Sequence, residues 1–73
     1  MNKNEVIEYL VTNIEDEDEP LFLLRGRDIL ASRTIMNWCE HAKSFSVPQK
    51  KIDSAAHVAI EMDRYIGPKR FPD

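Results

Sequence analysis

Residues 32–66, which read SRTIMNWCEHAKSFSVPQKKIDSAAHVAIEMDRYI, decide the fold of this chain. Apolar side chains recur at helical spacing over residues 32–45, and Ser32 is suited to cap that helix. After a tight connector, Pro48 fits the first turn of another helix, which runs to about Ile66 before a Gly-Pro stop signal. The pattern therefore predicts a helical hairpin over residues 32–66.

The first helix of this hairpin collects its apolar residues on one face. They are Ile35, Trp38, Cys39, Ala42 and Phe45. Because Trp38 shares this face with its apolar neighbours, we expect it to be largely buried and central to the core. Cys39, beside it, is in the usual position of an inert core cysteine.

The second helix of the hairpin has an apolar face that covers more than half of its circumference. Val58 and Tyr65 widen this face on one side, and Ile60 widens it on the other. An ordinary surface helix has a much narrower apolar stripe, and two other short helices cannot cover a face this wide. We therefore expect a homo-oligomer whose interface contains Val58, Ile60 and Tyr65.

The N-terminal part of the chain adds one helix and two connecting segments. Residues 4–14 have amphipathic spacing, with Asn4 as the expected N-cap. Residues 15–20 form an acidic linker, and residues 21–31 hold an apolar run followed by an Arg-Gly-Arg turn. A proline and a glycine bound that run and favour an extended segment over a helical turn. A run of four residues is too short for its periodicity to distinguish a strand from a helical turn. A lone strand would have to pair across an oligomer interface.

Together these elements predict one mainly α domain, a small three-helix domain spanning residues 1–73. A chain of this size buries only roughly 60% of the surface that its unfolded form exposes, so its core is thin. The tail, residues 67–73, is expected to be irregular. Phe71 in that tail either packs back on the body or is an exposed contact for a partner.

Charge is distributed unevenly along the chain. Residues 1–20 carry one lysine and seven acids, a balance of −6, whereas residues 21–73 carry nine bases and six acids, a balance of +3. Five of the acids are consecutive, at residues 15–19. Such a run is most often a solvated linker. The functional alternative is an arm that covers a basic site, either in this molecule or in a partner.

The candidate ligand-binding residues are Arg25, Gly26, Arg27 and Arg33. Gly26 would allow a close backbone approach or a positive φ, and guanidinium forks suit phosphate or carboxylate. A helix start just downstream would favour an anion. We expect this group to bind an acidic protein segment or a nucleotide-like ligand. The structural alternative is that the arginines pair with Asp28, with Asp63 or with the acidic linker.

Several classes of function find no support in the sequence. No Ser, His and carboxylate set suggests catalysis, and Cys39, His41 and His57 lack metal-ligand spacing, so we expect a non-enzymatic protein without metal or cofactor. His57 and Glu61, one turn apart, are expected to form a surface pair. One cysteine suits a reducing compartment. The absence of an apolar run of roughly 20 residues or of a signal sequence leads us to expect a cytoplasmic protein without membrane contact.

A DNA-binding helix-turn-helix is the alternative interpretation of the hairpin. The spacing of Ala42, Ser46, Val47, Ile52 and Ala55 is similar to the alanine, glycine and hydrophobic pattern of that motif, with serine replacing the turn glycine. The polar face of the second helix would then meet DNA. The acidic net charge and the few lysines near that face count against this alternative.

The segment Leu21-Phe-Leu-Leu-Arg-Gly-Arg-Asp-Ile-Leu-Ala31, followed by Ile35 and Trp38, resembles a pattern in small uncharacterised phage and bacterial proteins. These proteins carry a short hydrophobic run, an arginine, an aspartate followed by Leu-Ala, and a tryptophan seven residues on. The resemblance extends loosely over residues 19–66. It implies a phage or prophage accessory protein in the host cytoplasm, which binds a host enzyme or defence complex or sequesters a nucleotide signal.

Overall fold

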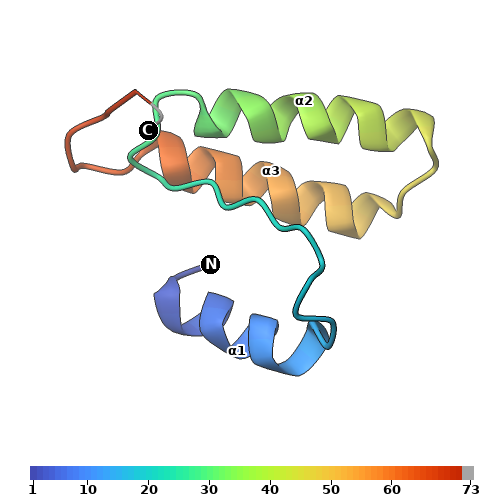
Figure 1. Ribbon diagram of the computed structural model, residues 1–73. Helices are drawn as coiled ribbons and strands as arrows, with labels where there is room; N and C mark the ends of the chain where they lie inside the picture. Colours follow the sequence, from blue (N-terminus) through green and yellow to red (C-terminus); the bar gives the residue numbers. More distant parts are fainter. Residues whose placement is uncertain (72–73) are drawn as a thin grey trace.

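The computed structural model describes residues 1–71, which form three helices. They are α1 (Lys3–Asn13), α2 (Ala31–Ser44) and α3 (Gln49–Asp63). Figure 1 shows α2 and α3 side by side in opposite directions, with α1 apart from them at the end of a long connection. The predicted three-helix, mainly α architecture is confirmed. Among the helices of this described part, none is both long and apolar enough to cross a membrane.

The core of the molecule lies between α2 and α3 and consists mostly of small side chains. Cys39, Ala42 and Ile52 form a buried cluster, and Ile35, Val47, Ala55 and Ala56 pack against it. Alanines on both helices let the two backbones approach closely, and Cys39 Sγ lies 3.7 Å from the carbonyl oxygen of Ile52. The buried apolar residues within 1–71 are Ala31, Cys39, Ala42, Ile52 and Ala59. This core is as thin as the chain length predicts.

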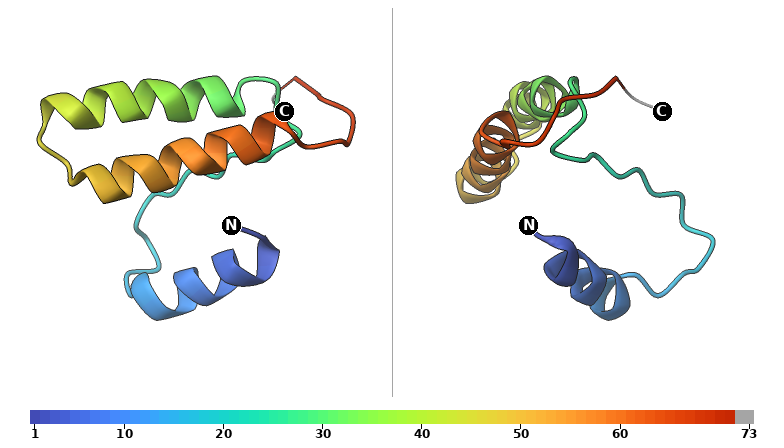
Figure 2. Two further views of the ribbon diagram at one scale, coloured as in Figure 1. Left: turned by 180° about the vertical axis from the view of Figure 1, so that it is seen from behind. Right: turned by 90° about the vertical axis from the view of Figure 1, so that its left-hand side faces the viewer.

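The turn between α2 and α3 is closed by a Schellman motif. Ser46 has φ 57°, the left-handed conformation that this position of the motif requires. Its N–H donates to the carbonyl of Lys43 at 3.3 Å, and the N–H of Val47 donates to the carbonyl of Ala42 at 3.1 Å. The chain therefore reverses direction at once. Figures 1 and 2 show an antiparallel hairpin, in contrast to the crossing at 90–120° of a DNA-binding helix-turn-helix.

The residues at which the three helices begin and end differ from those predicted from the sequence. Asn2, not Asn4, caps α1, and it forms a capping box with Glu5. Leu30 is the N-cap residue of α2 and gives no side-chain cap. Ser32, the expected cap, instead donates its hydroxyl to Asp63 Oδ1 at 2.6 Å. This bond joins the start of α2 to the end of α3, which stops three residues before the predicted Ile66.

The prediction that Trp38 is largely buried is wrong for the single chain. Its side chain is 43% exposed. The buried stripe of α2 contains Ala31, Cys39 and Ala42, and Trp38 lies at the edge of that stripe. No close backbone contact joins α1 to α2 or α3 within residues 1–71, so no third helix covers this edge.

Candidate functional site

The Arg-Gly-Arg segment forms a tight turn that leads into α2. The N–H of Asp28 donates to the carbonyl of Arg25 at 2.9 Å, and the N–H of Ala31 donates to the carbonyl of Asp28 at 3.1 Å. The Asp28 carboxylate accepts a hydrogen bond from the backbone N–H of Leu30 at 2.8 Å. Asp28 thus shapes the turn through backbone contacts.

The C-terminal tail docks on this turn through its backbone. The N–H of Arg70 donates to the carbonyl of Arg27 at 2.7 Å, and the N–H of Ile29 donates to the carbonyl of Arg70 at 2.8 Å. This makes a parallel bridge between Asp28 and Arg70. Apart from this isolated bridge, residues 67–71 have no helix or strand, and the Phe71 side chain is exposed.

Lys69 holds the tail and the turn together with its ammonium group. Its Nζ donates to the carbonyl of Gly26 at 2.8 Å and to the carbonyl of Met62. Met62 belongs to the last turn of α3, where carbonyls have no partner within the helix. A cation is favoured there by the helix dipole. Lys69 thereby caps α3 from the tail and fixes the turn beside it.

These contacts bring three arginines around one hollow of about 210 Å³, which we call the arginine pocket. Its lining consists of Phe22, Leu23, Arg25, Arg27, Asp28, Arg70 and Phe71. The combination is guanidinium groups beside two aromatic rings, with one carboxylate already engaged by the backbone. Sequence reasoning found Arg25 and Arg27 but missed Arg70 and its neighbour Lys69. The only signal for them was the pair of cations in the tail.

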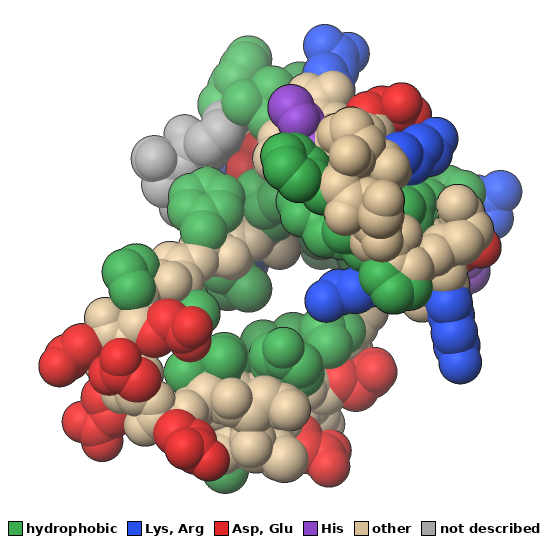
Figure 3. Space-filling view, turned by 90° about the vertical axis from the view of Figure 1, so that its right-hand side faces the viewer, with side chains coloured by type: hydrophobic (Ala, Val, Ile, Leu, Met, Phe, Trp, Pro, Cys, Tyr) green, Lys and Arg blue, Asp and Glu red, His purple; other side chains and the backbone are tan. Residues whose placement is uncertain are grey.

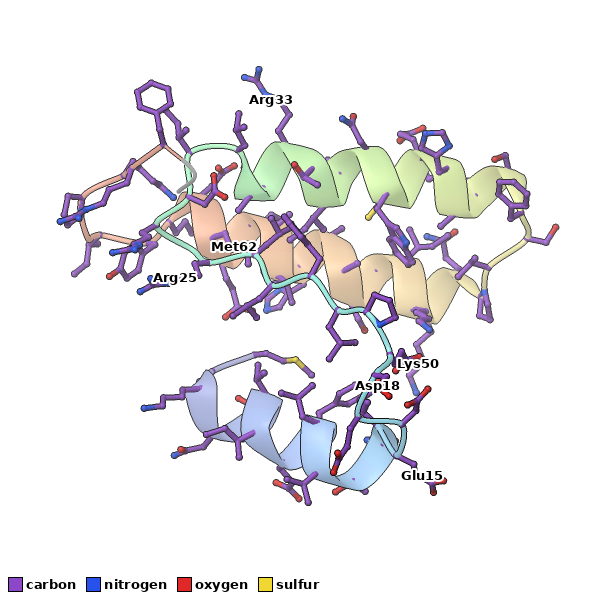
Figure 4. The ribbon with its side chains drawn as sticks, viewed as in Figure 1. Glu15, Asp18, Arg25, Arg33, Lys50 and Met62 are labelled. Carbon is purple, nitrogen blue, oxygen red and sulfur yellow. The ribbon has the colours of Figure 1, made fainter. Side chains whose placement is uncertain are left out.

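Arg33, the fourth predicted binding residue, lies outside the arginine pocket. It is exposed on the first turns of α2. Figure 4 shows Arg33 and Arg25 pointing away from each other on opposite sides of the hairpin. The reason is the sharp turn before α2. It directs Ser32 toward Asp63, to which the Ser32 hydroxyl donates a hydrogen bond, so that Arg33 lies on a different side of the helix. Of the four predicted residues, Arg25 and Arg27 line the arginine pocket, and Gly26 and Arg33 do not.

Gly26 does not have the special backbone that its sequence position suggested. Neither glycine has a positive φ. A Cβ at Gly26 would lie 3.7 Å from Tyr65 and 3.9 Å from Met62, which is ordinary van der Waals contact. The glycine is therefore not required by conformation, and its place in the site is the carbonyl that Lys69 binds.

The predicted oligomer residues divide between two surfaces of α3. Val58 and Tyr65 line a groove of about 820 Å³ that separates α1 from the hairpin. Val6, Ile7, Leu23, Leu24 and Met62 also line it. Figure 3 shows the hollow with hydrophobic side chains on both sides of it. Ile60 is half-exposed and is not part of this groove. Oligomerisation itself remains a prediction.

Acidic and basic side chains occupy different parts of the molecule. In Figure 3 the carboxylates gather on α1 and the linker, and most of the lysines and arginines lie on the hairpin. The linker turns on itself, since the N–H of Asp18 donates to Asp16 Oδ1 at 2.9 Å. Within the described chain, residues 15–19 form no ion pair with a lysine or arginine. Figure 4 shows Glu15 and Asp18 far from Arg25.

The remaining chemistry-bearing residues make ordinary contacts. His57 Nε2 lies 3.3 Å from Glu61 Oε1 on the surface, as the spacing predicted. Cys39 is a free, buried thiol. Residues 1–71 contain no group of three or more side chains arranged to hold a metal ion. The side chain of Asp63 accepts a hydrogen bond from the Ser32 hydroxyl.

Comparisons with protein-family models, with curated proteins and with solved structures each gave no match.

Proposed function

We propose that this chain is a non-enzymatic binding protein that acts as a homo-oligomer and binds a phosphate-bearing, nucleotide-like ligand in the arginine pocket. The observation that carries the proposal is the convergence of Arg25, Arg27 and Arg70 with Phe22 and Phe71 around one hollow. Planar guanidinium groups bind phosphate oxygens in pairs. Exposed aromatic rings offer a face on which a base stacks.

The size and composition of the pocket favour a small ligand over a folded partner. A hollow of about 210 Å³ accepts a phosphate group with part of its substituent. Both phenylalanine rings are largely exposed and lie beside the arginines, so stacking and charge pairing can act on one molecule. The resemblance to phage accessory proteins supports a role in which the protein sequesters a nucleotide signal in the host cytoplasm.

Calorimetric titration of the purified protein with ADP and with pyrophosphate tests this proposal. Charge-assisted contacts contribute roughly 1.5–3 kcal/mol each. Arg27→Ala and Arg70→Ala should therefore each weaken ADP binding about ten-fold or more. Arg33→Ala is the matched control, because it removes the same charge outside the pocket, and it should leave binding unchanged. Pyrophosphate should bind more weakly than ADP because it lacks a base.

Two results would count against the proposal. One is the absence of ADP binding by the unchanged protein, and the other is an equal loss of affinity in Arg33→Ala. Tight binding of an acidic peptide in place of ADP would mean that the pocket recognises protein carboxylates and not nucleotides.

Duplex DNA is a second candidate ligand, because Ser46 takes the left-handed conformation at the position where helix-turn-helix proteins usually have glycine. The antiparallel packing of α2 and α3 opposes this candidate. Titration of a short duplex at two salt concentrations separates the two ligands. Binding that weakens steeply with salt and is lost in Lys50→Ala, but not in Arg70→Ala, would favour DNA.

A further inference from the structure

The connection between the acidic linker and the Arg-Gly-Arg turn exposes an unusual amount of apolar surface. Leu21 is 59% exposed, Phe22 86% and Leu23 68%. Figures 1 and 2 show this stretch as extended chain, and the right-hand view of Figure 2 shows it standing clear of the helices. The backbone N–H and C=O groups of residues 21–24 form no hydrogen bond within the described part of the chain. Such an edge is a template for pairing with another chain.

The order of charges around this segment selects the partner. Acids precede it at residues 15–19, and Arg25 and Arg27 follow it. Two copies paired antiparallel bring the acids of one chain to the arginines of the other and align apolar with apolar side chains. Parallel pairing would place like charges opposite each other, which is destabilising. Within one chain the extended stretch keeps the two ends apart, as Figure 4 shows for Asp18 and Arg25.

We propose that two copies of this protein form a two-fold dimer in which residues 20–24 of each copy pair as antiparallel strands, with Phe22 opposite Phe22 of the partner subunit. A two-fold axis through an antiparallel pair places one residue opposite itself, because the interface is isologous. In this register Leu21 lies opposite Leu23 of the partner subunit. Glu19 then lies opposite Arg25 of the partner subunit.

Pro20 supports this register. Proline has no N–H, so it fits only where the strand makes no ladder bond at that residue. Hydrogen-bonded and non-hydrogen-bonded positions alternate in an antiparallel pair. If Pro20 occupies a non-hydrogen-bonded position, so does Phe22, and Leu21 and Leu23 make the ladder bonds.

The two neighbouring symmetric registers are worse. With Leu21 on the axis, Phe22 would face Pro20 of the partner subunit and Leu24 would face an acid. With Leu23 on the axis, Leu21 would face Arg25 of the partner subunit. Of these three registers, only the one with Phe22 on the axis places the apolar residues of one copy opposite apolar residues of the other. It also places the two Phe22 rings at a non-hydrogen-bonded position, where the side chains of opposite residues are closer.

The dimer interface shares Phe22, Leu23 and Arg25 with the arginine pocket. In the dimer, the partner's Glu19 approaches one side of the arginine pocket. Arg70 and Arg27 are not needed for the strand pairing. The two proposals can therefore fail separately.

Sedimentation velocity over a range of protein concentrations tests the interface through a charge-reversal set. Arg25→Glu and Glu19→Arg should each shift the protein from dimer to monomer, because like charges then face each other twice across the axis. The double variant restores opposite charges at both contacts and should recover the dimer. Arg33→Glu is the control for a change of net charge and should leave the dimer intact. ADP binding should stay weakened in the double variant, which separates this test from that of the ligand.

A thiol at the axis tests the register. Phe22→Cys places two thiols opposite each other and should form a disulfide-linked dimer rapidly on mild oxidation, whereas the buried Cys39 stays inert. Leu21→Cys places its thiol opposite Leu23 of the partner subunit and diagonal to its own copy, at about 7–8 Å, and should cross-link much more slowly. The proposal is overturned by a monomer at all concentrations, by a failure of the double variant to recover the dimer, or by equal cross-linking of the two cysteine variants.

Discussion

Replacing Ser46 with glycine should stabilise the protein. Ser46 has φ 57° and supplies one of the two bonds of the Schellman motif that closes α2, and no side-chain hydrogen bond within residues 1–71 compensates for this strained backbone. A side chain in the left-handed region costs roughly 1–2 kcal/mol, and the greater freedom of glycine in the unfolded chain returns roughly 0.5–1 kcal/mol of that. The net gain is about 0.5–1 kcal/mol. For a domain this small it raises Tm by roughly 2–8 °C.

Thermal and urea unfolding followed by circular dichroism measures this gain, and Ser54→Gly is the matched control. Ser54 is exposed in the middle of α3, where glycine costs roughly 0.5–1 kcal/mol. The same substitution should thus have opposite signs at the two serines. If Ser46→Gly lowers Tm as Ser54→Gly does, Ser46 has a negative φ in solution and the Schellman turn is incorrect.

Three further outcomes test the contacts that assemble the site. Lys69→Met removes the ammonium that binds two carbonyls; it should cost about 1 kcal/mol and speed amide hydrogen exchange at Arg70. Ser32→Ala and Asp63→Asn should each cost under about 1 kcal/mol and be strongly non-additive, whereas Arg33→Ala should leave Tm unchanged. Trp38→Ala should cost about 1–2 kcal/mol, below the 3–5 of a fully buried tryptophan, and acrylamide should quench the fluorescence of the single tryptophan efficiently.

The helices could be predicted from the sequence because their apolar periodicity is long and local. Residues 32–66 contain two amphipathic repeats joined by a short connector, and the structure confirms the hairpin. The end of α3 could not be predicted in the same way. The carbonyl of Met62 accepts from the N–H of Tyr65 and also from Lys69, which returns from the tail. A contact of this kind has no local signature.

Only part of the arginine pocket could be predicted from the sequence. Arg25 and Arg27 flank a glycine within one short turn, and both line the arginine pocket. Arg70 reaches the pocket only because its backbone pairs with Arg27 and Ile29, which lie more than forty residues earlier. Arg33 was included because it is near in sequence, yet the entry into α2 turns it to the opposite side.

The thin core and the exposed segment 21–23 have one physical origin. Only one hydrophobic side chain larger than cysteine, that of Ile52, is buried among residues 1–71, so the hairpin gains little free energy from burial. The free energy of folding of a small domain is a small difference between large terms. Pairing of Leu21, Phe22 and Leu23 with a second copy would remove apolar surface from water without enlarging the hairpin core. Folding and association are then linked, because any binding to the folded state alone stabilises it. Under this linkage the charges at residues 15–19 and at Arg25 act on stability through the partner, although they make no ion pair with each other in the single chain.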